Sequence, residues 1–257
     1  MQGVIKALTV LIAVIGVAGC SDTNDAPRAA VVSSVPNPIV TQVAGGRVSG
    51  GLRYDVTAFG YREQEYFFEG EAKTFPPSDL PPAVYRSRMI AWTPVDPSRF
   101  NGTTLVEWAH VSDFGQFELT VVINALSTML EEEGYAYVLV SAEEGGVCDQ
   151  GVTGCTATSL KGVAAGRYDE LHHPGDAYSF DIFNQALQAI KYPSGTTPLG
   201  GLGTRFVIVT GFQPSIDKWF PAGAPPGTGA SSPFGINGPL NAYLANGADH
   251  AAQLVKR

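Results

Sequence analysis

The stretch Arg205–Ser215, RFVIVTGFQPS, decides the fold that we expect. Phe206–Val209 is a short continuous apolar run followed at once by turn residues, a pattern typical of a buried parallel strand. Ligand-binding and catalytic groups gather at the carboxyl ends of such strands. We therefore expect a strand, a tight turn at Gly211, and Ser215 as a candidate nucleophile just beyond it.

The preceding part of the chain alternates between strand and helix patterns. Strands are predicted at Thr103–Val111 and Tyr135–Ala142, with a helix at Phe117–Glu133 between them. A second helix, at about Tyr178–Lys191, leads into the strand Arg205–Thr210. Alternation of this kind predicts a mostly parallel sheet with helices on both faces.

An extended pattern begins earlier, at Ile39. Three segments bounded by Gly or Pro, Leu52–Phe59, Glu65–Phe75 and Tyr85–Val95, predict an antiparallel β region at the N-terminal side. The aromatic run Tyr66–Phe68 fits either core packing or a platform for a ligand.

The C-terminal part lacks this alternation. Phe220–Pro239 is rich in Pro and Gly and predicts a loop. Leu240–Val255 predicts a further helix, of which Gly247 is the weak point.

The N-terminus has the composition of a signal peptide. Met1–Gly19 carries one basic residue, Lys6, and then the apolar run Ala7–Gly19. This run is shorter than the ~20 residues that a transmembrane helix needs. We expect it to be removed on export.

Val17–Cys20 (VAGC) resembles a bacterial lipoprotein box. That resemblance implies that Cys20 becomes the acylated N-terminus and anchors the protein to a membrane, facing the periplasm or the cell exterior. An ordinary secretory signal with an incidental cysteine is the alternative. Ser21–Pro38, rich in Ser, Asn, Asp, Pro and Ala, reads as a flexible tether.

Export makes the other two cysteines, Cys148 and Cys155, interpretable. Disulfides persist outside the cytoplasm, and six residues, two of them glycine, separate this pair. We expect them to form a bridge worth about 2 kcal/mol. A metal site is the competing idea, but no second pair of ligands lies nearby, and we expect neither a metal nor another cofactor.

The charge balance argues against nucleic acid as a partner. Without the signal segment the chain has 15 basic and 24 acidic residues, a net charge of −9, and no basic cluster. The sequence does not indicate the oligomeric state.

A family resemblance rests on three blocks. They are Phe100–Thr103 with Glu107–Ser112 (FNGT, EWAHVS), Ser141–Ala142, and His173–Phe183 (HPGDAYSFDIF). Over about Ser49–Gly211 the chain resembles the α/β-hydrolase-domain family of exported bacterial proteins. The resemblance implies an α/β-hydrolase fold and hydrolysis of a small ester-like substrate.

The chain departs from this family at the nucleophile. The family's turn reads glycine, any residue, serine, glutamine, serine, whereas this chain has Gln213 where the serine is expected. Pro214 follows, with no N–H for an oxyanion hole. Ser215 is then the candidate catalytic residue, although serine also favours a helix N-cap.

The histidines give no obvious base. His250 alone follows Ser215 in the usual order, and a surface position on the last helix is its simpler interpretation. His110 and Ser112 follow a strand at the place of an oxyanion loop. The resemblance also implies that His173 and Asp176 lie near the active-site rim. The block His173–Phe183 would hold the loop before the second helix in place.

These observations predict a signal peptide over 1–19, a tether over 20–38 and one domain over 39–257, irregular from about 212. The fold class is α/β, an incomplete α/β-hydrolase-like sheet, mostly parallel, with an N-terminal antiparallel β region. We interpret 212–239 as an insertion or a disturbed reading frame, followed by early termination. The predicted function is that of an exported serine hydrolase; the alternatives are an inactive or truncated relative and a periplasmic ligand-binding lipoprotein.

Overall fold

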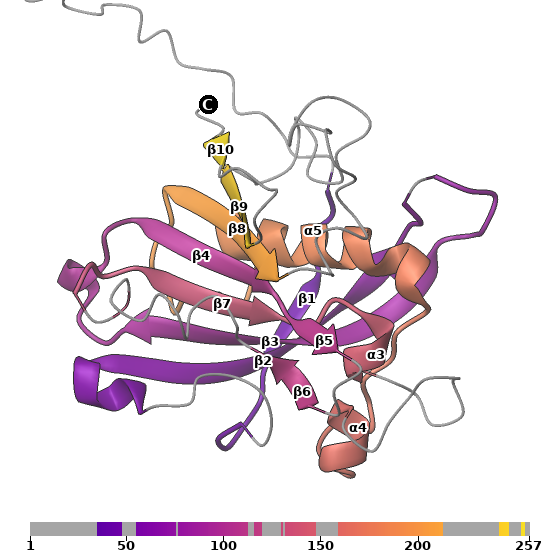
Figure 1. The fold of residues 1–257 in the computed structure, drawn as a ribbon, viewed down its shortest axis with the longest axis horizontal. Coiled ribbons are helices and arrows are strands. Elements are labelled where there is room, and N and C mark those ends of the chain that lie inside the picture. Colours follow the sequence, from indigo (N-terminus) through magenta and orange to yellow (C-terminus); the bar gives the residue numbers. More distant parts are fainter. Residues whose placement is uncertain are drawn as a thin grey trace, which may run out of the picture. The chain divides into compact units, whose positions relative to one another are not determined.

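The computed structural model describes residues 35–47, 55–75, 77–112, 116–119, 130, 132–147, 159–212, 242–246 and 253–254. All of them belong to one compact unit, Val32–Arg257. Figure 1 shows how their helices and strands are arranged.

Eight of the described strands form one mixed sheet in the order β1-β2-β3-β7-β4-β8-β9-β10. The first four pair antiparallel, the strands from β7 to β9 pair parallel, and β10 is antiparallel to β9. Their bounds are β1 Ile39–Gln42, β2 Tyr61–Ala72, β3 Ala83–Pro94, β7 Ala136–Val140, β4 Thr103–Trp108, β8 Phe206–Phe212, β9 Ala242–Asn246 and β10 Gln253–Leu254.

The remaining described strands, β5 (His110–Ser112) and β6 (Gln116–Leu119), form a separate antiparallel pair. The helix α5 (Ser179–Lys191) runs along one face of the large sheet, and two short helices lie near β5 and β6 (Figure 1). The shorter helices are α3 Glu144–Val147 and α4 Leu160–Val163, with 3-10 turns η1 Val56–Phe59, η2 Pro97–Arg99 and η3 Asp176–Tyr178.

The predicted antiparallel region and the parallel pairing of β7, β4 and β8 are confirmed, as is the helix before β8. The predicted strand over Leu52–Phe59 is wrong where the structure describes it, since Val56–Phe59 is a 3-10 turn. The Asp55 carboxylate accepts the N–H of Thr57, and Gly60 ends the turn with a φ of 75°. These two caps favour a turn over an extended strand.

The strand predicted over Thr103–Val111 divides in two, because β4 ends at Trp108 and the chain then enters β5. The helix predicted over Phe117–Glu133 is wrong at its start, where Gln116–Leu119 pairs with β5 as a strand. Leu130 is helical as predicted, and most of this predicted helix lies outside the described residues.

Two predictions fail near the end of the chain. Gly211 does not turn but continues β8, paired with Trp108 of β4. Ala242–Asn246, expected to be helical, is the strand β9. Its register with β8 supplies backbone hydrogen bonds along an otherwise open edge, so tertiary pairing overrides the local helical pattern. The loop predicted over Phe220–Pro239 lies outside the described residues.

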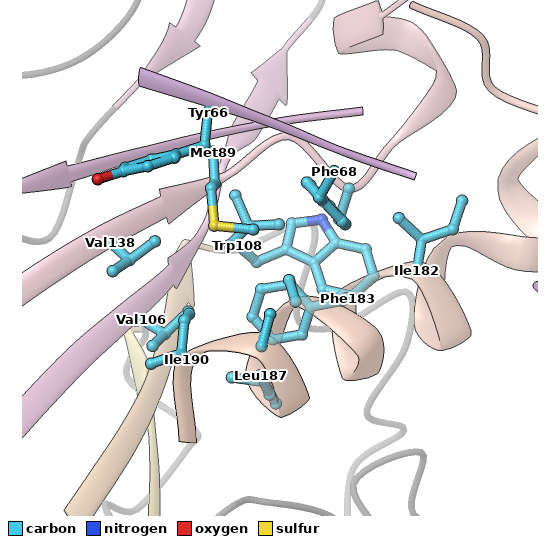
Figure 2. Packing of buried hydrophobic residues seen from close by; sticks show 14 of the residues in the cluster. Tyr66, Phe68, Met89, Val106, Trp108, Val138, Ile182, Phe183, Leu187 and Ile190 are labelled. Atoms are coloured by element: carbon cyan, nitrogen blue, oxygen red, sulfur yellow. The ribbon is translucent and has the colours of Figure 1, made fainter. Parts of the chain in front are cut away.

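The face of the sheet that α5 covers holds the larger part of the core. Alternate strand residues point to this face, as the two-residue period of a strand requires. Figure 2 shows Met89, Val106 and Val138 directed towards Phe183 and Leu187 of α5. All five side chains are fully buried.

The opposite face is buried as well. Leu105 of β4, with Tyr137 and Leu139 of β7, packs with Trp92, whose ring stacks on Tyr137 at 5.0 Å. Burial on both faces explains why β7 reads as a continuous apolar run and why apolar residues point to both sides of β4.

A charged network lies on this second face, over the strands β2 and β3. The Glu65 carboxylate accepts hydrogen bonds from the Tyr168 hydroxyl (2.7 Å) and from Arg88 Nη1 (3.4 Å). It also pairs with Arg167. The side chains of Glu65 and Arg88 are wholly buried, and burial raises the pKa of Tyr168, which keeps its hydroxyl a donor. The network therefore ties 167–168 to the sheet.

Truncating the α5 core contact tests the main packing. Leu187→Ala removes buried methyl groups and leaves a cavity, so we expect it to lower the free energy of unfolding by about 2–5 kcal/mol. Urea unfolding followed by circular dichroism measures this loss. Val84→Ala, at a side chain that is 67% exposed, should change stability by no more than about 0.5 kcal/mol. Equal losses in the two variants would contradict the packing.

Neutralising the network gives a second test. Glu65→Gln removes the carboxylate that the buried Arg88 guanidinium faces, and we expect a loss of about 3–5 kcal/mol in the same measurement. The matched control is Glu170→Gln, because Glu170 pairs with Arg86 at 3.1 Å but is 74% exposed. That change should cost at most about 1 kcal/mol. If Glu65→Gln loses no more stability than Glu170→Gln, the network has no role in stability.

Candidate functional site

The carboxyl ends of β4, β7 and β8 meet at one edge of the sheet, because these strands are parallel neighbours. Such an edge is where α/β sheets place ligand-binding and catalytic groups. The chain leaves the sheet here through Ala109 after β4 and through Ser141 after β7. The candidate site is built on the turn Ser141–Glu144.

The first residue of this turn is fixed to β3. The Ser141 N–H donates to the carbonyl of Arg88 at 2.9 Å, and the hydroxyl of Ser87 donates to the Ser141 carbonyl. Arg88 Nε lies 3.3 Å from the Ser141 hydroxyl oxygen. The charged network on Glu65 therefore reaches the carboxyl edge through Arg88.

The third residue of the turn, Glu143, is held from β4. Trp108 Nε1 donates to Glu143 Oε1 at 2.8 Å, and both side chains are buried. A buried carboxylate requires a donor of this kind, since it has lost most of its water. Trp108 also packs against Phe180 and Phe183 of α5, so the carboxylate is positioned by the main core.

His173 fastens the loop before α5 to the same turn. Its Nδ1 accepts the N–H of Gly175 at 3.2 Å, and its Nε2 lies 2.9 Å from the carbonyl oxygen of Ala142. Because Nδ1 accepts, Nε2 carries the proton and donates to Ala142. Each ring nitrogen of the buried imidazole is thus bonded to a backbone group.

Asp176 joins the turn from η3. Its Oδ1 accepts the N–H of Glu144 at 3.0 Å and lies 3.4 Å from the hydroxyl of Ser179, at the start of α5. The structure thus brings the predicted rim residues His173 and Asp176 together at one turn, one on each side of Glu143.

His110 and Ser112, predicted for the oxyanion loop, lie in β5 directly after Ala109. The Ala109 N–H donates to the carbonyl at the end of β7 at 2.9 Å, which starts β5 at the carboxyl edge. A Cβ built on Gly145 of α3 would lie 3.7 Å from Val111 Cγ2, so β5 runs close to α3. The backbone of the β5–β6 pair therefore borders the candidate site (Figure 1).

Four predicted residues lie outside the described residues. They are the candidate nucleophile Ser215, the lipidation site Cys20, and the predicted disulfide partners Cys148 and Cys155. Ser215 follows three residues after Phe212, where β8 ends at the carboxyl edge.

Sequence reasoning missed two buried carboxylates at this edge. Glu143 follows a buried strand directly, and that position was the available signal. Glu107 interrupts the apolar run of β4, and its fully buried carboxylate accepts the hydroxyl of Tyr137. A lone acidic residue inside a buried strand indicates a dedicated donor, but not which residue provides it.

The described residues contain no group of three or more His, Cys, Asp or Glu side chains arranged to hold a metal ion. Within the same part of the chain, no helix combines the length and apolar character needed to cross a membrane.

Comparisons with solved structures give low similarity. Lipase A of Candida antarctica is 11% identical with a TM-score of 0.31, covering 70% of this chain and 36% of that enzyme. The rice cell wall degrading esterase LipA of Xanthomonas oryzae is 11% identical with a TM-score of 0.28, covering 68% and 42%. This chain thus spans less than half the length of either enzyme, and similarity at this level bears on neither substrate nor mechanism.

Comparison with curated proteins gives no significant match. A family model, described as Alpha/beta hydrolase domain, matches residues 33–215, well over half of the chain. The match confirms both the resemblance seen in the sequence and the α/β fold class. The chain belongs to the alpha/beta hydrolase domain family.

Proposed function

We propose that this protein is a serine hydrolase that cleaves a small ester or a related acyl compound, with Ser215 as its nucleophile. The observation that carries the proposal is the position of Ser215 in the chain, just beyond a parallel strand that ends at the carboxyl edge. The family match extends as far as this residue. In this fold, a serine after such a strand attacks the substrate carbonyl.

The proposed reaction divides the work among the elements at the edge. The Ser215 oxygen adds to the acyl carbon and its proton passes to the departing alcohol; water then hydrolyses the acyl-enzyme, which releases the acid and returns a proton to Ser215. Backbone N–H groups of the β5 region face the oxyanion, because the loop after β4 occupies that place in this fold. His173 and Asp176 hold the turn Ser141–Glu144 as positioning residues and do not themselves carry the proton.

The alternative is a relative without catalysis, and Gln213-Pro214 in front of Ser215 is the observation that favours it. A proline after the usual nucleophile position supplies no N–H for the oxyanion. The two alternatives predict opposite results with a covalent serine probe: an active hydrolase is labelled, and a relative without catalysis is not.

Labelling with a fluorophosphonate probe tests Ser215. The serine oxygen displaces fluoride from phosphorus, so we expect the folded protein to gain one probe mass and Ser215→Ala to gain none. Intact-mass spectrometry makes the measurement. Ser194→Ala, at an exposed serine in the turn after α5, is the matched control and should label like the unchanged protein.

Two outcomes would contradict the proposal. If the folded protein is not labelled, the protein is not a serine hydrolase of this type. If Ser215→Ala is labelled as fully as the control, the nucleophile is another residue.

We propose further that the protein is exported and anchored through Cys20, on the evidence of the apolar run before this residue and of the lipoprotein-like box that contains it. Cells expressing the full chain and fed an alkyne-bearing palmitate should incorporate it into the protein, and Cys20→Ser should abolish incorporation. Cys148→Ser is the control and should incorporate as much lipid as the unchanged chain. Equal incorporation in Cys20→Ser would overturn the anchor.

A further inference from the structure

A small pocket lies where the loop between β2 and β3 meets the first turns of α5. Its cavity volume is about 80 Å³, and it opens into solvent. It is lined by Lys73, Thr74, Phe75, Phe180, Asp181 and Asn184. None of these residues belongs to the turn Ser141–Glu144, and the proposed hydrolysis makes no use of them.

Two aromatic rings form the apolar part of the pocket. Phe75 and Phe180 meet edge to face, with their centroids 5.0 Å apart and their planes at 72°. The backbone fixes this arrangement, because the Phe75 N–H donates to the carbonyl of Ala177 at 2.8 Å. The pocket is thus built by contacts between hairpin and helix.

The buried polar part of the pocket includes the carboxylate of Asp181. Asp181 Oδ2 accepts the backbone N–H of Lys73 at 2.8 Å and lies 3.2 Å from Gln185 Nε2, so both hydrogen bonds go to the same oxygen. Burial raises the pKa of Asp181, because the two donors compensate only part of the lost hydration.

Asn184 adds an unsatisfied acceptor. It lies three residues after Asp181, on the same side of α5, and only 9% of its surface is exposed. Its Oδ1 is buried and has no hydrogen-bond partner among the described residues. A buried amide oxygen in this state costs stability until a donor reaches it.

A carboxylate, an amide oxygen and two aromatic rings together favour a positively charged donor. An ammonium group supplies three N–H donors, and aromatic rings attract cations as well as apolar groups. An anion would face the Asp181 charge, and only the exposed Lys73 side chain would attract it. We propose that this pocket binds a small ligand that joins a primary ammonium to an apolar group, with the ammonium at Asp181 and Asn184 and the apolar group against Phe75 and Phe180.

The protein contains its own reporter for this pocket. Trp108 packs edge to face on Phe180, with centroids 5.5 Å apart, and its indole N–H is held by Glu143. Trp92 is the internal reference, because it stacks on Tyr137 on the other face of the sheet and donates to Glu63. A ligand in the pocket should therefore shift the indole signal of Trp108 and leave that of Trp92 in place.

Benzylamine is the probe for a titration of the ¹⁵N-labelled protein followed by NMR. We expect a saturable shift at Trp108 with benzylamine, and at least tenfold weaker binding of benzyl alcohol and benzoate. Asp181→Asn keeps the size of the side chain and an acceptor for the Lys73 N–H, and should weaken benzylamine binding by at least about tenfold. Asp79→Asn, at an exposed carboxylate of the same hairpin, is the control and should bind like the unchanged protein.

Several results would overturn the proposal. They are benzylamine binding that Asp181→Asn leaves unchanged, benzoate binding as tight as benzylamine binding, equal shifts at Trp92 and Trp108, and no saturable shift. Because no serine chemistry is involved, the outcome is independent of labelling at Ser215. The Trp92 signal also reports whether Asp181→Asn is folded.

Discussion

Burial of the parallel strands β4 and β7 on both faces is the constraint on which the rest of the structure depends. β4 lies between β7 and β8, and α5 packs against one of its faces while Leu105 joins a second apolar cluster on the other. Parallel neighbours require crossover connections, which return the chain to the same end of the sheet each time. The carboxyl ends of the strands are therefore brought to one edge, and the turns that follow them can share hydrogen bonds.

The parts of the fold that local pattern predicts are those in which local pattern and tertiary pairing agree. The composition of Phe206–Val209 favours a strand. Its pairing with β4 and the packing of its residues with α5 favour the same state. Ala242–Asn246 is different, since its composition suits a helix and its strand state depends on the register with β8. His110 and Val111 are likewise predicted to continue the strand that begins at Thr103. They belong to the separate strand β5 instead, because β5 pairs with β6.

The candidate site divides in the same way. The resemblance indicated His173 and Asp176 because they stand in a recognisable block, and the structure brings them to one turn. Nothing local indicates that Trp108 donates to Glu143, because the two residues are 35 positions apart and meet only once β4 and β7 are paired. The bond from Tyr168 to Glu65 spans 103 positions. Such partners follow from topology, and topology is what a single sequence specifies least directly.

The hydrogen bonds of the turn Ser141–Glu144 have a consequence for the order of assembly. The Ser87 bond spans 54 positions, whereas the bonds from His173 and Asp176 span 31 and 32 positions in the other direction. Contacts of this range form only after long loops have closed, which is a slow part of folding. The turn therefore acquires its final geometry late, after the sheet and the loop before α5 have met. A short peptide with this sequence lacks the partners that shape it, so the candidate site is a property of the completed domain.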